Sequence, residues 1–545
     1  MFFQFSMYFS TMSLCKLGIA CKLLLFMVLC TTISLSAQTS FSFETFGGSP
    51  LPLVLISTSD TIVDEPRVIA AMKIINQGGG GMNHPYDDPT DYNGRISIEI
   101  RGSSSQSFPK RSFSLETQDS SGNNNNVSLL GMPEENDWVL YGPYSDKTMM
   151  RNAIMYGLGE RIDRYTVRRR YCELFINENY RGVYLFMESV KRDKNRIDIA
   201  KLLPSDTIGD ELTGGYILKI DRMVGEENGW RSDYPSLGGG SVWIQLWRPK
   251  GPELHPVQRT YIEGYIGMFE NLLFGDDFSD PSSGYSEVID VQSFVDLSLA
   301  NELSKNIDGY RLSTYFFKKK DSNGGKIVMG PWWDYNLALG NADYCEAAIS
   351  EGFVADTDCG TNSPMWFERL RADPSYEELL RSTWKAYRSD VWSNSSIDLM
   401  IDSLATLLSE PQKRDDARWP RMGQYVWPNP FVGEDFEEEV QFLRDWLDSR
   451  LIWLDQQFGL IPMDYPSQPP LNPYPQPTKG LFRIRGDLEV FSLRIYDIMG
   501  RIVDEQQHLY SYQTINIQHL PNGMYVIECT LVDGQIATTK LLKSN

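Results

Sequence analysis

The sequence has few of the side chains that bind zinc and related metals. Only four His and seven Cys occur among the 545 residues, and they form no CxxC pair and no Cys/His cluster. Tetrahedral zinc sites need three or four such ligands at short spacing. The composition therefore argues against a zinc centre.

Basic residues are also scarce relative to acids. The chain carries 51 Lys and Arg against 72 Asp and Glu, which gives a formal net charge of -21. A surface with this balance repels phosphate backbones and anionic headgroups. We therefore exclude nucleic acid and anionic membranes as the main partners.

Long apolar runs are missing beyond the N-terminus. Lysines flank the start of an apolar stretch at 23–30, and small residues follow it, which predicts a signal peptide over 1–37 with cleavage after Ala37. A lipoprotein modified at Cys30 is disfavoured by the bulky Val28 and Leu29. A retained membrane anchor stays open as the alternative. No other segment reaches about 18 apolar residues, so we expect an exported mature chain without a transmembrane helix.

Four cysteines remain once the signal peptide is removed. Cys345 and Cys359 are close in the sequence, and in an oxidising compartment we expect them to form a disulfide. Two free thiols in a mobile loop are the alternative. Cys172 lies within a strand pattern, which predicts a plain buried residue.

The most informative stretch spans residues 306–340. Two strand-like runs at 314–318 and 327–329, separated by a turn rich in Lys, Asn and Gly, predict a β-hairpin. Asp308 precedes the first run and Asp334 follows the second, so antiparallel pairing brings both carboxylates to one end. One carboxylate can position a hydroxyl while the other holds a metal on phosphates. The stretch therefore predicts a metal–nucleotide site.

The N-terminal part of the mature chain has strand-like runs at 52–58, 70–76 and 95–102, which predict a β-rich lobe. A turn of Gly and Ser with following Lys110 and Arg111 comes next. Backbone N–H groups and basic side chains in such a turn can hold phosphate oxygens. A solvated loop is the alternative.

A change of apolar period after residue 146 predicts a helix capped by Ser145 or Asp146, with Arg151 on its first turns. Two further strand-like runs within 171–199 predict a hairpin whose second strand ends at Glu188. Protein kinases place the hinge to their second lobe after such a strand.

Several blocks, in this order, resemble the spore-coat CotH kinase family. They are RGSSSQSFPKRSFSLE, LLGMPEENDWVLYGPYSDKTMMRNAIMYGL, ELFINENYRGVYLFMESVKRDKNRIDI, TGGYILKIDR and NIDGYRLSTYFF with GPWWDYNLALG. The resemblance covers residues 43–461. It implies an α+β, atypical protein-kinase-like fold with two lobes, a β-rich N-lobe and a helical C-lobe. It also implies transfer of phosphate from ATP to serine residues of proteins, with Mg or Mn.

The resemblance also implies roles for individual residues. Asp308 would be the catalytic acid of the loop, and Asp334, helped by Asn336, would bind the metal. The expected nucleotide-binding residues are Lys110, as a phosphate contact, and then Arg101, Arg151 and Glu188.

Two positions depart from the family pattern. Arg111 stands where a second Lys is expected, and it presents a different geometry to phosphate. Asn336 stands where a further acid is common, which leaves the metal site one negative charge short. A catalytically degenerate cell-surface adhesion or scaffold protein with the same fold is therefore the alternative to an active kinase.

The last part of the chain changes character twice. Apolar residues at helical spacing over 366–460 predict a helical lobe. Residues 462–479 hold seven prolines in eighteen positions and predict an extended linker. Strand runs over 480–545 predict a small all-β sandwich. With its motifs IYDIMGRIV, LPNGMYVI and KLLK, this segment resembles the C-terminal sorting domain of type IX secretion cargo. This resemblance implies export through the type IX machinery and attachment at the cell surface, with a generic adhesive module as the alternative.

Overall fold

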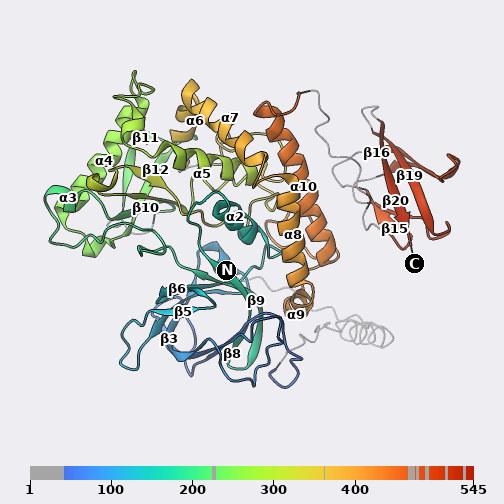
Figure 1. The fold of residues 1–545 in the computed structure, drawn as a ribbon, viewed down its shortest axis with the longest axis horizontal. Coiled ribbons are helices and arrows are strands. Elements are labelled where there is room, and N and C mark those ends of the chain that lie inside the picture. Colours follow the sequence, from blue (N-terminus) through green and yellow to red (C-terminus); the bar gives the residue numbers. More distant parts are fainter. Residues whose placement is uncertain are drawn as a thin grey trace, which may run out of the picture. The chain divides into compact units, whose positions relative to one another are not determined.

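The computed structural model describes residues 42–223, 229–360, 362–463, 473, 478–484, 490–509, 513–531 and 536–544 (Figure 1). The predicted signal peptide and most of the predicted linker lie outside the described residues. Among the described helices, none has both the length and the hydropathy needed to cross a bilayer.

Seven strands of the N-terminal region close into a barrel. They are β1 (Leu53–Ser57), β2 (Val68–Ile75), β3 (Tyr92–Arg101), β4 (Ser112–Gln118), β7 (Asp137–Tyr141), β8 (Arg169–Ile176) and β9 (Asn179–Glu188). Their order in the sheet is β1-β2-β3-β4-β7-β9-β8, and parallel pairing of β1 with β8 closes it. The predicted strands at 52–58, 70–76 and 95–102 are confirmed as β1, β2 and β3.

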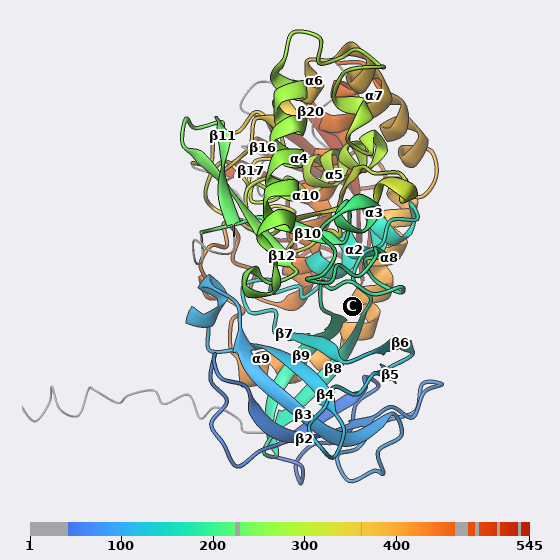
Figure 2. The ribbon, with the colours of Figure 1, turned by 90° about the vertical axis from the view of Figure 1, so that its left-hand side faces the viewer.

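Alternating apolar residues explain why these strands form a closed sheet. In β3, Ile96 and Ile98 are fully buried, and they pack with Leu115 of β4 and Trp138 of β7 in one core. Alternation places every second side chain inside the barrel, and closure leaves no strand edge unpaired. Figure 2 shows how β2, β3 and β4 run side by side in this barrel. A short separate hairpin pairs β5 (Val127–Leu129) with β6 (Met132–Glu135).

Helix α2 (Arg151–Glu160) lies between β7 and β8 in the sequence and begins later than predicted. Its N-cap is Met150, because Met149 just before it has a left-handed φ of 61° that interrupts the helix. The predicted cap residue Asp146 nevertheless accepts a hydrogen bond from the backbone N–H of Arg151 at 2.9 Å. Nine of its ten residues are buried, so α2 is a core helix.

A second, five-stranded sheet follows, which the sequence prediction of a helical second lobe had left out. Its strands are β10 (Tyr216–Ile220), β11 (Gly229–Pro235), β12 (Ser241–Arg248), β13 (Thr314–Lys318) and β14 (Ile327–Met329). They are ordered β11-β12-β10-β13-β14, and the pairing of Phe316 with Met329 confirms the predicted β13–β14 hairpin.

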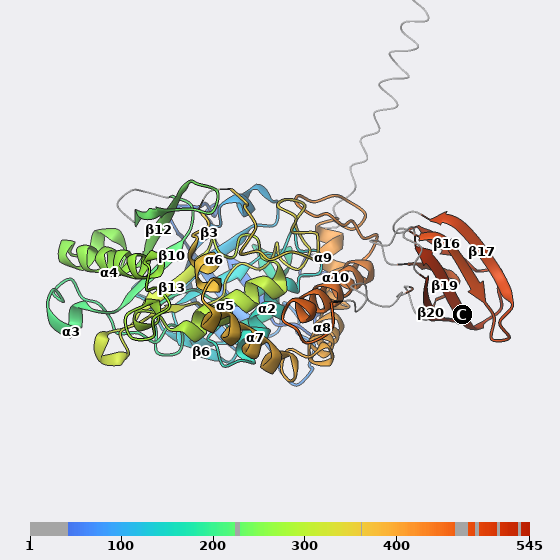
Figure 3. The same ribbon diagram turned by 90° about the horizontal axis from the view of Figure 1, so that it is seen from above.

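Most of the helices lie around this sheet, and those from α6 onward form the helical region predicted over 366–460. The helices that follow α2 are α3 (Gly209–Leu212), α4 (Pro256–Phe274), α5 (Val291–Ser304), α6 (Trp366–Arg371), α7 (Pro374–Arg388), α8 (Asn394–Leu408), α9 (Pro411–Arg418) and α10 (Phe436–Gln457). Helix α5 is central: twelve of its fourteen residues are buried, and it contacts α2, α7, α10 and β14. Figure 3 shows α5 beside α2 and α7. Helix α9 instead packs on barrel strand β9.

The C-terminal region is all-β, as predicted. One antiparallel sheet has the order β17-β16-β19-β20 and another pairs β15 with β18, and their buried residues share one core. The strands are β15 (Leu481–Arg483), β16 (Val490–Tyr496), β17 (Ile502–Leu509), β18 (Thr514–Asn516), β19 (Gly523–Leu531) and β20 (Ile536–Lys543).

Candidate active site

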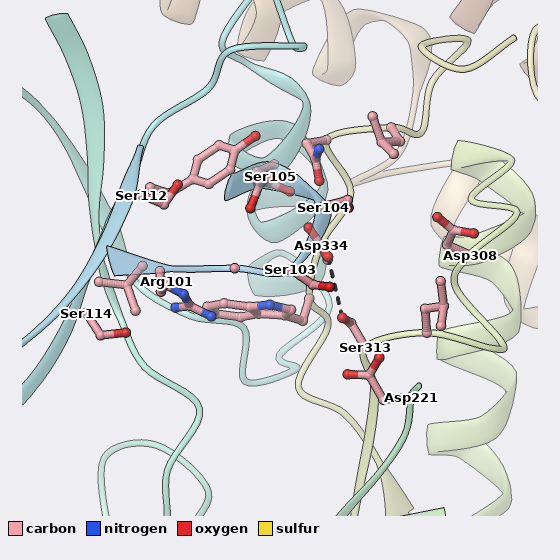
Figure 4. A pocket seen from close by; sticks show the side chains of 18 of the residues that line it. Arg101, Ser103, Ser104, Ser105, Ser112, Ser114, Asp221, Asp308, Ser313 and Asp334 are labelled. Carbon is pink, nitrogen blue, oxygen red and sulfur yellow. Dashed lines mark hydrogen bonds between the residues drawn. The ribbon is translucent and has the colours of Figure 1, made fainter. Parts of the chain in front are cut away.

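A cavity of about 450 Å³ lies where the end of barrel strand β3 meets the second sheet and the loops around it. Four of the seven predicted site residues line it: Arg101, Asp308, Asp334 and Asn336. Figure 4 shows the two acids on either side of the cavity, with the serines after Arg101 close to Asp334. The sequence prediction that the hairpin brings both acids to one place is confirmed.

Asp308 lies on the loop between α5 and β13. Its Oδ1 accepts hydrogen bonds from Arg311 Nε at 3.1 Å and Nη2 at 2.7 Å, and its Oδ2 accepts one from Tyr344 Oη at 2.9 Å. The side chain retains 20% of its exposure, so it still reaches the cavity. Arg311 and Tyr344 bind opposite oxygens and fix the plane of the carboxylate, while Oδ2 keeps a second lone pair for a ligand.

Asp334 follows β14 and has a left-handed backbone with φ 68°. Its N–H donates to Tyr156 Oη at 3.2 Å, and its Oδ2 accepts a long hydrogen bond from Ser313 Oγ at 3.4 Å. Strained backbone of this kind is retained where the surrounding structure holds it, and it clusters at functional sites.

The electrostatics of Asp334 are unusual. The Asp334 side chain is exposed to the cavity, yet the protein packed around it disfavours the charged form and raises its pKa to about 6. The charge of Asp308 contributes to this rise, whereas nearby Arg101 opposes it. A carboxylate in this state gains from a cation supplied by a ligand.

One side chain on α5 ties the loops of both acids together. Asn301 Nδ2 donates to the carbonyl of Gly309, next to Asp308, at 2.9 Å, and its Oδ1 accepts from Tyr335 Oη, next to Asp334, at 3.1 Å. A Cβ on Gly309 would lie 2.4 Å from Asn301 Oδ1, so only glycine fits there.

Helix α2 holds the Asp334 loop from the other side. Asn152 Oδ1 accepts a hydrogen bond from the backbone N–H of Tyr335 at 2.7 Å. Sequence reasoning missed Asn152 and Asn301. The available indication was a buried amide within an apolar helix, since buried polar groups are retained where they are hydrogen-bonded.

Arg101 ends β3 and opens the serine loop. Gly102 after it has φ 107°, and the short helix η1 (Ser104–Ser107) follows. The Arg101 guanidinium lies 5.3 Å from the centre of the Trp333 ring, and burial lowers its pKa while the charge of Asp334 raises it. The cavity therefore has a desolvated cation beside a loop of hydroxyl groups, which suits phosphate.

Lys219 and Asp221 also line the cavity, and sequence reasoning did not assign them. They alternate on β10 and its exit, and Lys219 Nζ lies 2.8 Å from Asp221 Oδ2 and 4.6 Å from the centre of the Trp247 ring. The alternation of charged and apolar residues in the stretch LKID could have indicated that both face one side of a strand.

Lys110, the predicted phosphate contact, is not among the residues that line the cavity. Its ammonium is fully buried and lies 2.5 Å from Asp415 Oδ1 on α9, and the other carboxylate oxygen of Asp415 pairs with Arg421. Burial lowers the pKa of Lys110 to about 8, and the Asp415 charge opposes that shift. The structure corrects the expected role: Lys110 holds the barrel to α9.

Arg151 and Glu188 are likewise structural in this fold. Arg151 is buried, pairs with Asp146 at 2.7 Å and donates to the carbonyl of Ala338 at 3.1 Å. Glu188 accepts from Arg168 Nη1 at 2.9 Å and from Tyr165 Oη at 3.1 Å. Neither residue lines the cavity. Their charges are neutralised by internal partners instead.

The residues around Asp334 suit a hard cation that arrives with phosphates. Within the described ranges, no group of three or more His, Cys, Asp and Glu side chains has the arrangement of a metal site. Mg²⁺ is usually bound by one or two carboxylates together with substrate phosphates and water. The carboxylate of Asp334, the amide of Asn336 and the hydroxyl of Ser313 face the cavity and supply oxygen donors. This donor set fits Mg²⁺ or Mn²⁺.

The predicted disulfide is confirmed. Cys345 and Cys359 are bonded, with 5.5 Å between their Cα atoms. Tyr344, the residue before Cys345, donates to Asp308 and stacks on Trp427 with ring planes 7° apart. The disulfide therefore anchors the chain directly after Tyr344, which is a partner of Asp308. Cys172 is buried and free, as predicted.

Two family models match this chain. A family model described as CotH kinase protein matches residues 98–454, and one described as a secretion system C-terminal sorting domain matches residues 472–544. No curated protein matches the chain. The first match covers more than half of the sequence, so the chain belongs to the CotH kinase protein family and carries a C-terminal sorting domain.

Proposed function

We propose that this protein is an exported kinase that transfers the γ-phosphate of ATP to serine residues of proteins. The observation that carries the proposal is the cavity shared by Asp308 and Asp334, on two loops joined through Asn301. Phosphoryl transfer has a loose transition state, so alignment and charge neutralisation supply most of the catalysis. A few fixed carboxylates and cations are therefore sufficient.

The chain's own residues have distinct roles in this reaction. Asp308, oriented by Arg311 and Tyr344, accepts or directs the proton of the attacking serine hydroxyl. Asp334 and Asn336 hold the divalent cation, which neutralises charge on the phosphate oxygens when it is bound.

The opposite wall of the cavity contacts the phosphates. Arg101 and Lys219 present positive charge there, and the hydroxyls of the serine loop donate hydrogen bonds. These groups replace Lys110, Arg151 and Glu188 in the nucleotide site that we propose.

The sorting domain supports a proposal for where this activity takes place. We propose that residues 480–545 engage the type IX secretion machinery and that the signal peptide at 1–37 delivers the chain to it. The kinase would then act outside the cell or at its surface, on protein substrates with accessible serines.

A scaffold without transferase activity is the second candidate. It is favoured by Asn336, which leaves the cation site with fewer negative charges, and by the two protein donors already bound to Asp308. A scaffold of this kind has no need for Mg-dependent stabilisation by ATP.

One experiment separates the two candidates. The mature protein is incubated with ATP and Mg²⁺ or Mn²⁺, and mass spectrometry measures phosphate added to its own serines and to a mixture of exported proteins. We expect phosphoserine with the wild type and none above background with Asp308→Asn. Equal phosphorylation by both proteins would refute the assignment of Asp308, and no phosphorylation by the wild type would favour the scaffold.

A further inference from the structure

A second cavity of about 480 Å³ adjoins the candidate active site. Arg101, Trp247, Tyr315 and Trp333 line both cavities, so the two lie side by side. The second cavity is lined neither by Asp308 nor by Asp334. Its floor is β12, and its far end is formed by residues 189–190, where the chain leaves barrel strand β9.

Gln245 of β12 faces this cavity. Along the strand, Val242, Ile244 and Leu246 are buried in the main core, so the alternating Gln245 and Trp247 face the other side. Gln245 therefore presents a side-chain amide to the floor of the cavity.

The amide of Gln245 is not satisfied within the protein. The residue is only 8% exposed, and its Oε1 has no hydrogen-bond partner among the described residues. A buried acceptor without a partner is destabilising, and such groups are rare in folded proteins. An unpaired amide beside an open cavity indicates that a ligand completes its hydrogen bonds.

The other walls suit a flat ring. Trp247 and Trp333 line the cavity, and each already holds a cation near its ring: Lys219 at 4.6 Å from Trp247 and Arg101 at 5.3 Å from Trp333. Indole surfaces bind heteroaromatic rings by stacking. The cavity thus combines indole surfaces and one amide that can both donate and accept with a rim of acidic and basic side chains, among them Glu99, Asp137 and Arg248.

We propose that this second cavity binds the base of the nucleotide and that Gln245 recognises adenine. A glutamine amide pairs with adenine through two hydrogen bonds, with Oε1 accepting from the exocyclic amine and Nε2 donating to a ring nitrogen. The nucleotide then spans Arg101, with its phosphates beside Asp334 and its base over β12. This inference rests on the proposed function, because it assigns the base subsite of the same nucleotide.

The test compares the binding of a triphosphate that carries an adenine base with the binding of one that has no nucleobase. Isothermal titration with Mg²⁺ measures the affinity of the mature chain for ATP, for inorganic tripolyphosphate, and for purine riboside triphosphate, which lacks the exocyclic amine. The variant is Gln245→Met, which keeps the length of the side chain and removes the amide. Gln258→Met is the matched control, since Gln258 is also buried but donates to the carbonyls of Leu203 and Asp206.

We expect wild type and Gln258→Met to bind ATP about 10- to 100-fold more tightly than tripolyphosphate. In Gln245→Met that preference falls to a few-fold, tripolyphosphate affinity is unchanged, and the melting temperature does not fall. Purine riboside triphosphate binds the wild type about as weakly as ATP binds Gln245→Met. This pattern supports the proposal, and a purely structural role of Gln245 would lower stability without changing the preference.

Two results overturn the inference while leaving the proposed function in place. One is a Gln245→Met variant that keeps the full preference for ATP, and the other is a wild type that binds ATP and tripolyphosphate equally. Failure of the wild type to bind either ligand would overturn the proposed function and this inference together.

Discussion

Two groups of charged side chains in this protein have opposite arrangements. Around Asp334 the charges face a cavity, and the carboxylate has one long side-chain hydrogen bond, from Ser313 at 3.4 Å. Around Asp415 the charges face one another: Lys110 and Arg421 pair with its two oxygens, and the N–H of Val183 donates to Oδ1 at 2.8 Å.

The comparison shows how to tell a binding site from a structural ion pair. The side chain of Asp415 is fully buried, whereas that of Asp334 is exposed to the cavity. The two acids also differ in whether internal partners neutralise them. Asp334 has one long side-chain hydrogen bond and retains capacity for a ligand, whereas a Lys, an Arg and a backbone N–H already bind the Asp415 carboxylate. Four substitutions test this distinction, and each one separates activity from stability.

Asp334→Asn should have the largest effect, and it should act on activity alone. The amide keeps the size of the side chain but removes the charge that binds the cation, so we expect the rate of serine phosphorylation to fall by about 1,000-fold or more. The free energy of unfolding should stay equal or rise, because the ionised carboxylate is disfavoured there. Kinetic assays with urea titrations measure both.

Asp343→Asn is the control for this variant, since Asp343 is an exposed acid bonded to Tyr425 outside the cavity. Asp343→Asn should change neither the rate of serine phosphorylation nor the free energy of unfolding. A large loss of stability in Asp334→Asn would place Asp334 with the structural ion pairs instead.

Asp415→Ala should have the converse effect. It leaves Lys110 and Arg421 buried without a carboxylate, and removing one partner of a buried pair costs about 3–5 kcal/mol. We expect the free energy of unfolding to fall by that amount, measured by urea denaturation. Lys110→Met combined with Asp415→Leu should recover part of the loss, because no lone charge then remains between these two positions.

One result would contradict the structural role that we assign to Lys110. If Lys110→Met alone abolished ATP binding while the folded protein kept its stability, Lys110 would belong to the nucleotide site after all.

Tyr344→Phe should have a smaller effect, confined to activity. It removes one hydrogen bond to the Asp308 carboxylate, and a hydrogen bond to a charged group contributes about 1.5–3 kcal/mol. We expect kcat to fall about tenfold, with little change in KM for ATP or in the melting temperature. Steady-state kinetics at several ATP concentrations separate the two parameters, and a change in KM alone would exclude a role for Tyr344 in orienting Asp308.

Ser313→Ala should have the smallest effect. The hydrogen bond from Ser313 to Asp334 is long, so its loss should lower kcat by about threefold and leave the fold intact. Ser313→Thr, which keeps the hydroxyl, serves as the comparison. An effect as large as that of Asp334→Asn would mean that the hydroxyl itself is an essential ligand.

The sequence predicted those features of the site that depend on neighbouring residues. The β13–β14 hairpin, the acids Asp308 and Asp334 at its end, and the disulfide between Cys345 and Cys359 all follow from short stretches of chain. Alternation and turn residues determine such features locally.

The roles of the basic residues could not be predicted in the same way. Lys110 lies in a segment that suits phosphate binding, but its partner Asp415 is 305 positions away in the sequence. Lys219 lies in the cavity because the second sheet brings β10 to it, and that sheet was not predicted. The charge of a side chain can be read from the sequence, whereas the residue that pairs with it depends on the tertiary fold.

The attachment of α9 to the barrel also has a consequence for the order of folding. Synthesis delivers the barrel strands first, yet the acid that neutralises Lys110 is translated only after the segments that form the second sheet. Until then the nascent barrel holds an ammonium group in its wall without a counter-ion, which opposes its closure. We expect truncated chains ending before residue 411 to be sensitive to proteolysis throughout the barrel. The N-terminal strands and α9 thus mature as one cooperative unit, late in the life of the nascent chain.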